Sequence, residues 1–446
     1  MTERIETGLD YGSGKVGRLF SKIFFPTLLG MIFNALLTIT DGVIVGRGVG
    51  PDGIASVNII APLFMVATGI GLMFGIGASV IAGINLAQNN ASRANATMTH
   101  AFIFSTVLML AIVAAGLFCT KEIATALGSS PRLLGKTTDY LFWLMPGIVF
   151  LTFQSIGMMV IRLDGSPKYA MMCNIIPAVI NGVLDYMLVF PLDMGVKGAS
   201  IATSLSTIIG GLMALTYFCG SSYVLKFTAS TTAIWRNLLN QIKIGSSAFI
   251  TEIAMSVMML TGNYVFMTTY HEAGVAAYSI ACHLFPLIFM INNAVAQSAQ
   301  PIISYNYGAG NNSRVKAALR VSLTTAMICG LNATCGIAGG ARFIVGLFID
   351  PACEAAQIAT SGLPIFATCA IFFALNISFI GYYQSIKQAT KAIVLTLLRG
   401  VVLLVPLFLI IPRLIPTWGA WAAIPTSEIL TLIITLILFY RHRATM

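Results

Sequence analysis

The sequence predicts an all-α polytopic membrane protein with twelve transmembrane helices, organised as two parallel six-helix bundles that repeat each other. Three observations predict this fold class. The 446-residue chain is 57% hydrophobic and only 9% charged, whereas soluble domains contain about 25% charged residues. Twelve apolar segments approach or exceed the length of about 20 residues that a membrane-spanning helix needs. The second half of the chain also aligns with the first half without a gap.

The charge and the cysteines exclude several classes of protein. The net charge of +10 arises from 25 basic and 15 acidic residues. In a soluble protein such a charge would indicate nucleic-acid binding, but in a membrane protein the basic residues are explained by topology. The eight cysteines form no CxxC pair and lie mostly within apolar segments. We interpret them as packing residues, neither disulfides nor metal ligands.

Residues 1–19 are predicted to form a polar cytoplasmic tail without a cleavable signal, because the first apolar segment is too long for one. Residues 12–15 read Gly-Ser-Gly-Lys. A phosphate-binding loop would also need Gly at position 9 and Ser or Thr at position 16, where the chain has Leu9 and Val16. We therefore expect no ATP site and no direct drive by ATP.

The first bundle is predicted over residues 20–219 and the second over residues 244–446. Residues 220–243 link them, with a short amphipathic helix expected around residues 231–243 and anchored by Trp235. The predicted transmembrane segments are 20–45, 54–84, 97–119, 138–161, 169–190, 198–219, 244–268, 275–303, 321–341, 359–383, 392–412 and 419–440.

Two details of the first segments bear on packing and movement. In the second segment, Gly71 and Gly75 have the small-xxx-small spacing that lets helix backbones approach closely. Pro26 lies within the first segment and removes one backbone hydrogen bond. We therefore consider Pro26 a candidate hinge.

Topology follows from the basic residues. With the N-terminus in the cytoplasm, 18 of the 25 lysines and arginines lie in cytoplasmic segments and 7 lie outside, as the positive-inside rule requires. Both termini are then cytoplasmic, and we expect the protein in the cell inner membrane.

The internal repeat has a period of 221 residues. The shift aligns polar loop residues that chance does not readily match: Asn90 with Asn311, Ser92 with Ser313, and Arg93 with Arg314. It also pairs residues 198–199 with residues 419–420. Six helices per repeat gives parallel bundles related by an axis along the membrane normal. Two such bundles facing each other would enclose a central cavity.

Acidic residues within the spans are the candidate functional groups, because a buried intramembrane acid is costly and is functional by default. Asp41, Asp185 and Thr203 all lie roughly 7 Å below the outer ends of their segments, at 1.5 Å per residue. Asn181 is one turn before Asp185, hence on the same helix face. These four oxygen-bearing side chains predict a cage for Na⁺ or a shared proton. The alternative is that both acids are hydrated near the rim and cap loops.

The remaining two acids, Glu252 and Glu428, are candidates for a substrate cavity that meets a cationic compound. For each, the alternative is a carboxyl group hydrogen-bonded among helices. The other proposed lining residues are Asn34, Met255 and Gln300. The repeat aligns Asp41 with a glycine, so the ion chemistry is predicted to be confined to the first half.

Several stretches resemble a known family over almost the whole chain, from Lys22 to Arg443. They are residues 26–46, 162–167, 181–185, 195–200, 300–308 and 418–421. Together they are similar to the multidrug and toxic compound extrusion (MATE) transporters, in particular the bacterial MepA-like or DinF-like branch.

The resemblance implies two six-helix lobes in a V-shaped arrangement and export of organic, mostly cationic compounds in exchange for Na⁺ or H⁺. It also implies the cation-site role for Asp41, Asn181, Asp185 and Thr203. Some relatives have a second acid site in the other lobe. Here Glu252 fills its first part, but the tenth segment offers only Asn376.

Two other functions are alternatives for a polytopic helical protein of this composition. A lipid-linked oligosaccharide flippase would need a strongly cationic cavity for pyrophosphate, whereas the intramembrane charges here are mainly acidic. A membrane enzyme would need a catalytic cluster in a loop, and the loops are short. We therefore expect a non-enzymatic, monomeric transporter that has no cofactor beyond its coupling ion, binds organic cations and the lipid bilayer, and binds no nucleic acid.

Overall fold

The computed structural model describes residues 8–229 and 234–444, and these residues form helices and no β-strand. Eleven of the described helices are long and apolar enough to cross a membrane. One of them, α8 (Ile234–Gly308), contains both the seventh and the eighth predicted segments, divided at His271, whose φ of 58° and ψ of −150° are not helical. The predicted fold class, a polytopic all-α membrane protein, is thereby confirmed.

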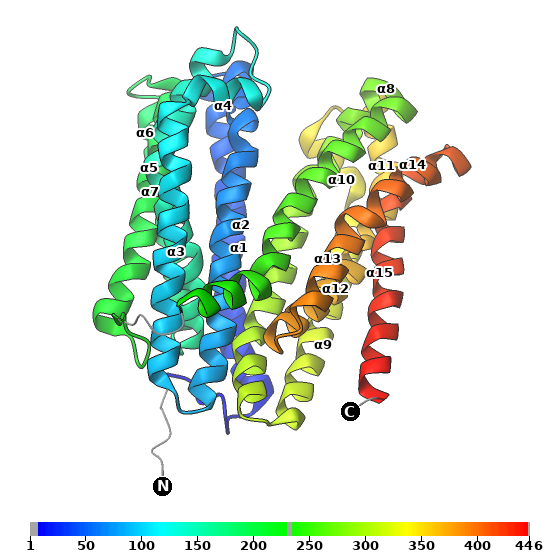
Figure 1. The fold of residues 1–446 in the computed structure, drawn as a ribbon. Coiled ribbons are helices and arrows are strands. Elements are labelled where there is room, and N and C mark those ends of the chain that lie inside the picture. Colours follow the sequence, from blue (N-terminus) through cyan, green and yellow to red (C-terminus); the bar gives the residue numbers. More distant parts are fainter. Residues whose placement is uncertain (1–7, 230–233, 445–446) are drawn as a thin grey trace. The chain divides into compact units, whose positions relative to one another are not determined.

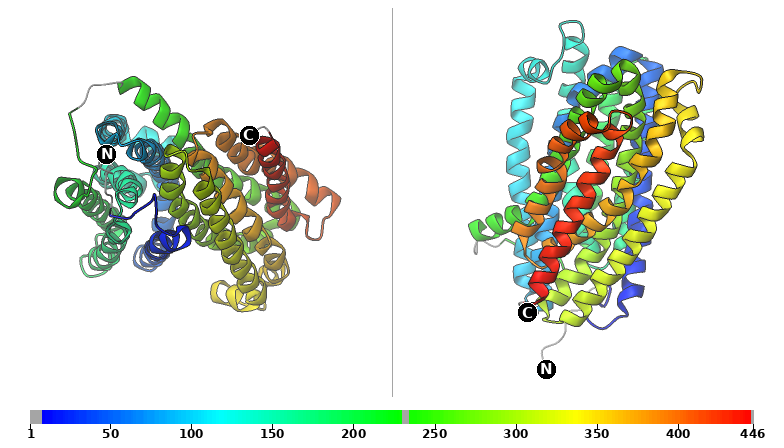
Figure 2. Two further views of the ribbon diagram at one scale, coloured as in Figure 1. Left: turned by 90° about the horizontal axis from the view of Figure 1, so that it is seen from below. Right: turned by 90° about the vertical axis from the view of Figure 1, so that its right-hand side faces the viewer.

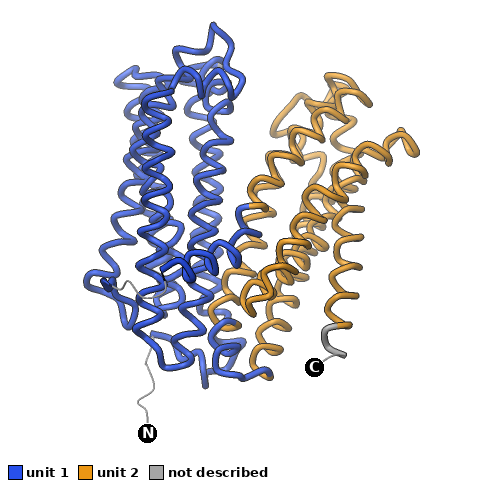
Figure 3. Tube along the Cα trace, in the orientation of Figure 1, with its two compact units in different colours: residues 1–249, 304–312 blue, residues 250–303, 313–446 orange. Residues whose placement is uncertain are grey.

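The chain divides into two compact units (Figure 3). Unit 1 comprises residues 1–249 and 304–312, and unit 2 comprises residues 250–303 and 313–446. The helix α8 therefore contributes to both units. The boundaries predicted for the lobes and the linker stay predictions.

Unit 1 contains a bundle whose helices are coloured blue to green in Figure 1. Its elements are α1 (Val16–Gly48), α2 (Pro51–Ala87), α3 (Ala91–Phe118), α4 (Thr120–Ala126), α5 (Leu134–Leu163), α6 (Pro167–Val189), α7 (Gly195–Thr216) and the π-helix η1 (Tyr217–Ser221). Helix α6 packs against α1 and α7, and α5 packs against α7 and α2. The side chain of Asn90 caps α3 by accepting a hydrogen bond from the backbone N–H of Arg93 at 3.1 Å.

The glycines of α2 explain how its two neighbours in unit 1 approach it. A Cβ at Gly71 or Gly75 would meet Ser155 on α5, and one at Gly77 would meet the backbone of Gln241 on α8. The missing side chains let α5 and the start of α8 lie close to α2. The predicted role of these glycines in packing is confirmed.

The first described turns of α8 coincide with the amphipathic helix predicted around residues 231–243, of which residues 231–233 lie outside the described residues. Trp235 is 74% exposed, whereas Gln241 is fully buried against α2. The side chain of Gln241 donates to the backbone oxygen of Thr97 at 2.8 Å, which ties this helix to α3 as well.

The described part of the N-terminal tail packs onto one end of unit 1, where α5 and α8 end. Tyr11 is 1% exposed. Its phenol donates to the backbone oxygen of Arg162 at 2.5 Å, and its own backbone oxygen accepts from the side chain of Asn306 at 3.0 Å. Tyr11 therefore joins the end of α5 to the end of α8.

Asp164, which follows α5, fixes the chain that leaves η1. Its carboxyl group accepts hydrogen bonds from the backbone N–H groups of Tyr223, Val224 and Leu225 at 2.7, 3.0 and 2.9 Å, and from the Tyr217 phenol at 2.7 Å. Burial raises the pKa of Asp164, and these hydrogen bonds oppose the rise. The carboxyl thus satisfies three backbone donors that lie outside regular structure.

Unit 2 is built from part of α8 and from the later helices, coloured yellow to red in Figure 1. These are α9 (Asn312–Gly339), α10 (Ala341–Phe348), α11 (Glu354–Ala367), α12 (Cys369–Ser385), α13 (Ala389–Leu397), the π-helix η2 (Leu398–Val402), α14 (Leu404–Leu414) and α15 (Gly419–Ala444). Helix α15 packs against α12 and α14, and the right-hand view of Figure 2 shows it running beside the orange helices.

The core of unit 2 is rich in aromatic side chains. The rings of Phe266 and Tyr278 stack with their centroids 4.5 Å apart, and Trp421 meets Phe266 edge-on at 4.8 Å. The Tyr278 phenol donates to the backbone oxygen of Met258 at 3.2 Å. Apolar area and satisfied polar groups together fix the helices of this unit against one another.

Candidate cation site

The predicted cation-site residues lie on three helices of unit 1 that pack against one another. Asp41 lies near the end of α1, Asn181 and Asp185 lie on α6, and Thr203 lies on α7. Asp185 is fully buried, and Asn181, one turn earlier on the same helix, is 2% exposed. Helix α6 packs against both α1 and α7, so the three helices that carry these residues are neighbours.

The carboxyl groups of Asp41 and Asp185 lie within hydrogen-bonding reach of each other. Three of their buried oxygens have no hydrogen-bond donor among the described residues: Oδ1 of Asp41 and both side-chain oxygens of Asp185. Neither acid takes part in an ion pair with a described basic residue. Two ionised carboxylates only accept hydrogen bonds and repel each other at this separation, and a proton or another cation between them would relieve the repulsion.

Tyr140 of α5 completes the group and was not identified from the sequence. Its side chain is 6% exposed, is hydrogen-bonded to the side chain of Thr203, and interacts electrostatically with both Asp41 and Asp185. The hydroxyl of Ser200 donates to the backbone oxygen of Tyr140 at 2.5 Å, which fixes α7 against α5 at this level. Tyr140 lies only two residues into the predicted segment 138–161 and carries no charge, so the depth argument applied to Asp41 does not select it.

An apolar layer covers the acid pair on the side of the helix ends. Val45, Val189 and Ala199 form a buried cluster, exposed by 1%, 2% and 0%. Each lies four residues, or about 6 Å, from Asp41, Asp185 or Thr203 along its own helix. The layer therefore separates the oxygen-rich group from the loops that follow α1 and α6.

The chemistry of the donor set fits a hard monovalent cation or a proton. Carboxylate and hydroxyl oxygens are ligands for hard cations, and no soft sulfur or imidazole ligand belongs to the set. No group of three or more His, Cys, Asp or Glu side chains in the described chain could hold a metal ion. The four oxygen-bearing side chains and Tyr140 are therefore a candidate site for such a cation.

The five predicted substrate-cavity residues belong to both units. Asn34 is exposed on α1 in unit 1. Glu252 and Met255 are partly buried on α8, and Gln300 is 3% exposed farther along that helix. Their contact with a substrate stays a prediction.

Glu428 on α15 has the alternative environment that the sequence left open. Its side chain is 3% exposed and forms an ion pair with Arg399 at 2.9 Å. It is therefore a carboxyl group satisfied among helices of unit 2.

Pro26 lies inside α1, which continues as one helix on both sides of it. The proline has no N–H to donate to the backbone oxygen of Lys22, so α1 lacks one hydrogen bond about four turns before Asp41. Its role as a hinge stays a prediction.

Comparison with known proteins identifies related chains over nearly the full length. The family model MatE matches residues 26–187 and 247–410. The multidrug export protein MepA of Staphylococcus saprophyticus subsp. saprophyticus is 24% identical over 422 residues, which cover 94% of this chain and 93% of that protein. MepA of Staphylococcus haemolyticus is 26% identical over 391 residues, covering 86% of this chain and 85% of that protein.

Two solved structures share the fold. A multidrug resistance MATE family transporter of the MOP superfamily, in an outward-facing conformation, superposes with a TM-score of 0.91 at 22% identity, covering 99% of each chain. A MOP superfamily transporter from Pyrococcus furiosus gives a TM-score of 0.90 at 22% identity, again over 99% of each chain.

Proposed function

Because the chain belongs to the MatE family, we propose that it is a secondary-active multidrug exporter, which moves organic, mostly cationic compounds out of the cell in exchange for Na⁺ or H⁺. The MepA proteins to which it is similar are named multidrug export proteins. Their similarity extends over at least 86% of this chain, which supports the same class of activity here.

The observation that carries the ion coupling is the pairing of Asp41 with Asp185. Two buried carboxyl groups within hydrogen-bonding reach, neither in an ion pair with a described basic residue, repel each other when both are ionised. A Na⁺ ion or a proton relieves the repulsion and is held by Asp41, Asp185, Asn181 and Thr203, with Tyr140 bonded to Thr203 beside them. The site thus has a different charge, and a different preferred arrangement of α1 and α6, with and without its ion.

Coupling follows when the ion and the drug favour different arrangements of the same helices. The exported compound binds in the substrate cavity proposed for Asn34, Glu252, Met255 and Gln300. The hinge proposed at Pro26 lets α1 bend. An exchange of one monovalent cation for another moves no net charge across the membrane. The chemical gradient of the ion then supplies the free energy, because the membrane potential contributes about 2.3 kcal/mol per 100 mV only for net charge moved.

The orientation in the membrane follows from the distribution of basic residues. We place both termini in the cytoplasm and the protein in the inner membrane, where it acts as a monomer. In this orientation, the acid pair is nearer to the outer surface, behind the apolar layer of Val45, Val189 and Ala199.

The test is gradient-driven efflux of a cationic dye from proteoliposomes, with Na⁺ and H⁺ gradients imposed separately. Asp41→Asn should abolish efflux driven by the coupling ion while the protein still inserts and binds the dye. Asp52→Asn is the matched control, because Asp52 pairs with Arg132 at 2.6 Å and is partly exposed. Undiminished ion-driven efflux by Asp41→Asn would refute the proposed coupling site.

A further inference from the structure

Unit 2 contains a buried ion pair on two of its helical elements. Arg399 belongs to the π-helix η2 and Glu428 to α15, and their side chains are 6% and 3% exposed. The internal shift of 221 residues aligns Arg399 with Ala178 on α6, and Glu428 with Thr207 on α7. The pair therefore bridges the two elements of unit 2 that repeat α6 and α7.

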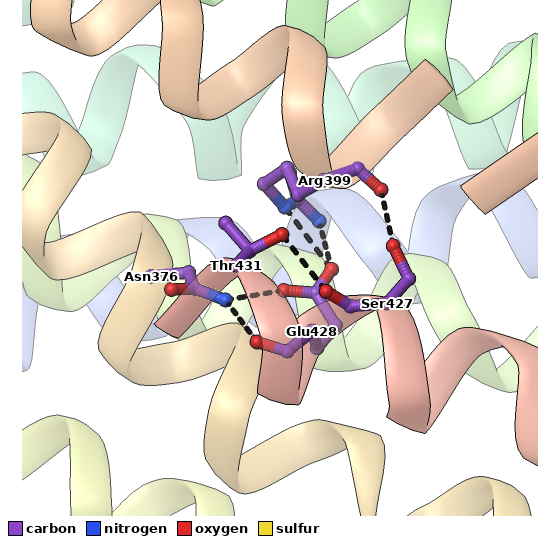
Figure 4. A network of polar contacts seen from close by, with 5 residues as sticks. All are labelled: Asn376, Arg399, Ser427, Glu428 and Thr431. Atoms are coloured by element: carbon purple, nitrogen blue, oxygen red, sulfur yellow. Dashed lines mark hydrogen bonds and ion pairs between the residues drawn. The ribbon is translucent and has the colours of Figure 1, made fainter. Parts of the chain in front are cut away.

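Both carboxylate oxygens of Glu428 have donors (Figure 4). Oε1 accepts hydrogen bonds from Nε and Nη2 of Arg399 at 3.0 and 2.9 Å, and Oε2 accepts from the side-chain amide of Asn376 on α12 at 2.8 Å. The same amide also donates to the backbone oxygen of Glu428 at 2.9 Å. These two acceptors fix the orientation of the Asn376 side chain, which leaves its own oxygen buried without a hydrogen-bond partner.

Arg399 is positioned by further contacts on either side. Its guanidinium carbon lies 4.3 Å from the centroid of the Phe373 ring, which stabilises the cation from the apolar side. Its backbone oxygen accepts a hydrogen bond from Ser427 at 3.0 Å, and the backbone oxygen of Ser427 accepts one from Thr431 at 2.8 Å. The hydrogen bond from Ser427 thus holds the π-helical turn that contains Arg399 against α15. Such turns are often found at functional sites.

Other ionisable groups near the pair are few. The Cys369 thiol on α12 interacts electrostatically with both charges. The remaining charged side chains of α11 to α14 lie near helix ends and are Glu354, Lys391 and Arg413. Arg399 therefore provides the positive charge that faces Glu428 from these elements.

We propose that Arg399 is a built-in cation that permanently occupies the site formed by Glu428 and Asn376, so that this site binds no exchangeable ion and coupling is restricted to the Asp41–Asp185 pair. This inference depends on the ion-coupled export proposed above. A guanidinium remains protonated at physiological pH and cannot leave. Asp41 and Asp185, in contrast, have no basic partner among the described residues.

The proposal makes Arg399 a determinant of ion specificity and stoichiometry. Without the guanidinium, Oε1 of Glu428 loses both of its donors, and the carboxylate keeps only the Asn376 amide as a partner. A buried carboxylate in that state takes up a proton or a hard cation such as Na⁺. Removal of Arg399 should therefore create a second ion site and not merely destroy a structural contact.

The experiment measures ion binding to the purified full-length protein in nanodiscs, by equilibrium binding of ²²Na⁺ and by the change in melting temperature with Na⁺ or proton concentration. The background is Asp41→Asn/Asp185→Asn, which removes the site in unit 1. In this background we expect no ion response. Adding Arg399→Met should restore one bound ion and an ion-dependent rise in melting temperature, and adding Glu428→Gln to that variant should remove both.

Arg413→Gln is the control for loss of a positive charge from unit 2, because Arg413 is exposed at the end of α14, and it should create no ion site. If Arg399→Met does not fold, Glu428→Gln in the same background still tests the proposal, since it should change no ion response while Arg399 is present.

Two outcomes would overturn the inference: no ion response after Arg399→Met, or a residual response of the background that Glu428→Gln removes. Both outcomes are measured as ion binding to the purified protein. A failure of the export proposal would instead appear as the absence of ion-driven efflux by the unmutated protein.

Discussion

Val189 of α6 packs against Val45 of α1 in a buried cluster, one helical turn beyond Asp185 and Asp41 respectively. Each of the two acids therefore has an apolar side chain between it and the nearer end of its helix. Ala199 of α7 is the third buried member of this cluster. An ion that reaches the pair from this side has to cross a layer without polar groups, which makes the layer a barrier to leakage.

Substitution of Val189 by Thr should weaken this barrier. The two side chains have nearly the same shape, but the hydroxyl group favours entry of water into the layer. We expect the passive leak of the coupling ion to rise ~10-fold, equivalent to about 1.4 kcal/mol in the barrier. The leak is measured in proteoliposomes that contain no transported compound, with a fluorescent indicator of Na⁺ or pH trapped inside them.

Val183→Thr is the matched control, because Val183 lies on the same helix and is 53% exposed. Equal leak rates for Val189→Thr and for the unmutated protein, with both correctly folded, would show that the layer is not the barrier.

The close approach of α1 and α6 depends on Gly48. A Cβ at this position would overlap Cγ1 of Val189. Gly48→Ala should therefore separate the two helices and destabilise the protein by about 1–3 kcal/mol, as is typical of overpacking. The measurement is the melting temperature in detergent together with the apparent affinity for the coupling ion, which should also fall.

Gly42→Ala tests the same exchange on the same helix where there is space, since no atom lies within 4 Å of the added Cβ. It should leave the melting temperature unchanged or raise it, because alanine is favoured over glycine in a helix by about 1 kcal/mol. A similar loss in both variants would attribute the effect to glycine itself and not to the contact with Val189.

Tyr140→Phe should weaken ion binding without unfolding unit 1. The phenol is hydrogen-bonded to the Thr203 side chain next to the acid pair, and loss of one such bond costs about 0.5–1.5 kcal/mol. We expect the concentration of Na⁺ or H⁺ that gives half-maximal efflux to change by up to ~10-fold, with the maximal rate largely retained. Tyr186→Phe is the control, since Tyr186 is 59% exposed on α6. If both variants behave alike, Tyr140 has no part in the site.

The sequence was sufficient to predict the helices and the level of the acid pair. Helix length and chain direction fix depth in the bilayer, and depth alone brought Asp41, Asp185 and Thr203 together. Tyr140 was not predicted, because it carries no charge and a tyrosine near the end of a transmembrane segment is typical of the membrane interface. The predicted segments 244–268 and 275–303 both exist within α8, and His271, where the two helices are divided, lies in the predicted gap between them.

The pairing of Arg399 with Glu428 could not be derived from the sequence. Both residues are recognisable as intramembrane charges, but whether they meet depends on the rotation of η2 and α15 about their own axes. That rotation is set by side-chain packing, including the contact of Arg399 with Phe373, and has no one-dimensional signature. The buried Tyr11 is a similar case, because nothing in a polar tail marks one tyrosine as a packing residue.

Tyr11 should contribute to stability through its phenol in a manner that does not depend on pH in the physiological range. Burial raises the pKa of Tyr11 above its ordinary value, and a group whose pKa is higher in the folded state stabilises the fold fully below its unfolded pKa of about 10. Tyr11→Phe loses the hydrogen bond to the Arg162 backbone and should destabilise unit 1 by about 0.5–1.5 kcal/mol. The loss should be constant between about pH 6 and 9, because the phenol stays protonated in both the folded and the unfolded protein over that range. Melting temperatures of both proteins across this range measure it, with Tyr223→Phe as control because Tyr223 is 60% exposed. A difference that shrinks as the pH rises toward 9 would mean that the phenol ionises there and is not the buried donor to Arg162.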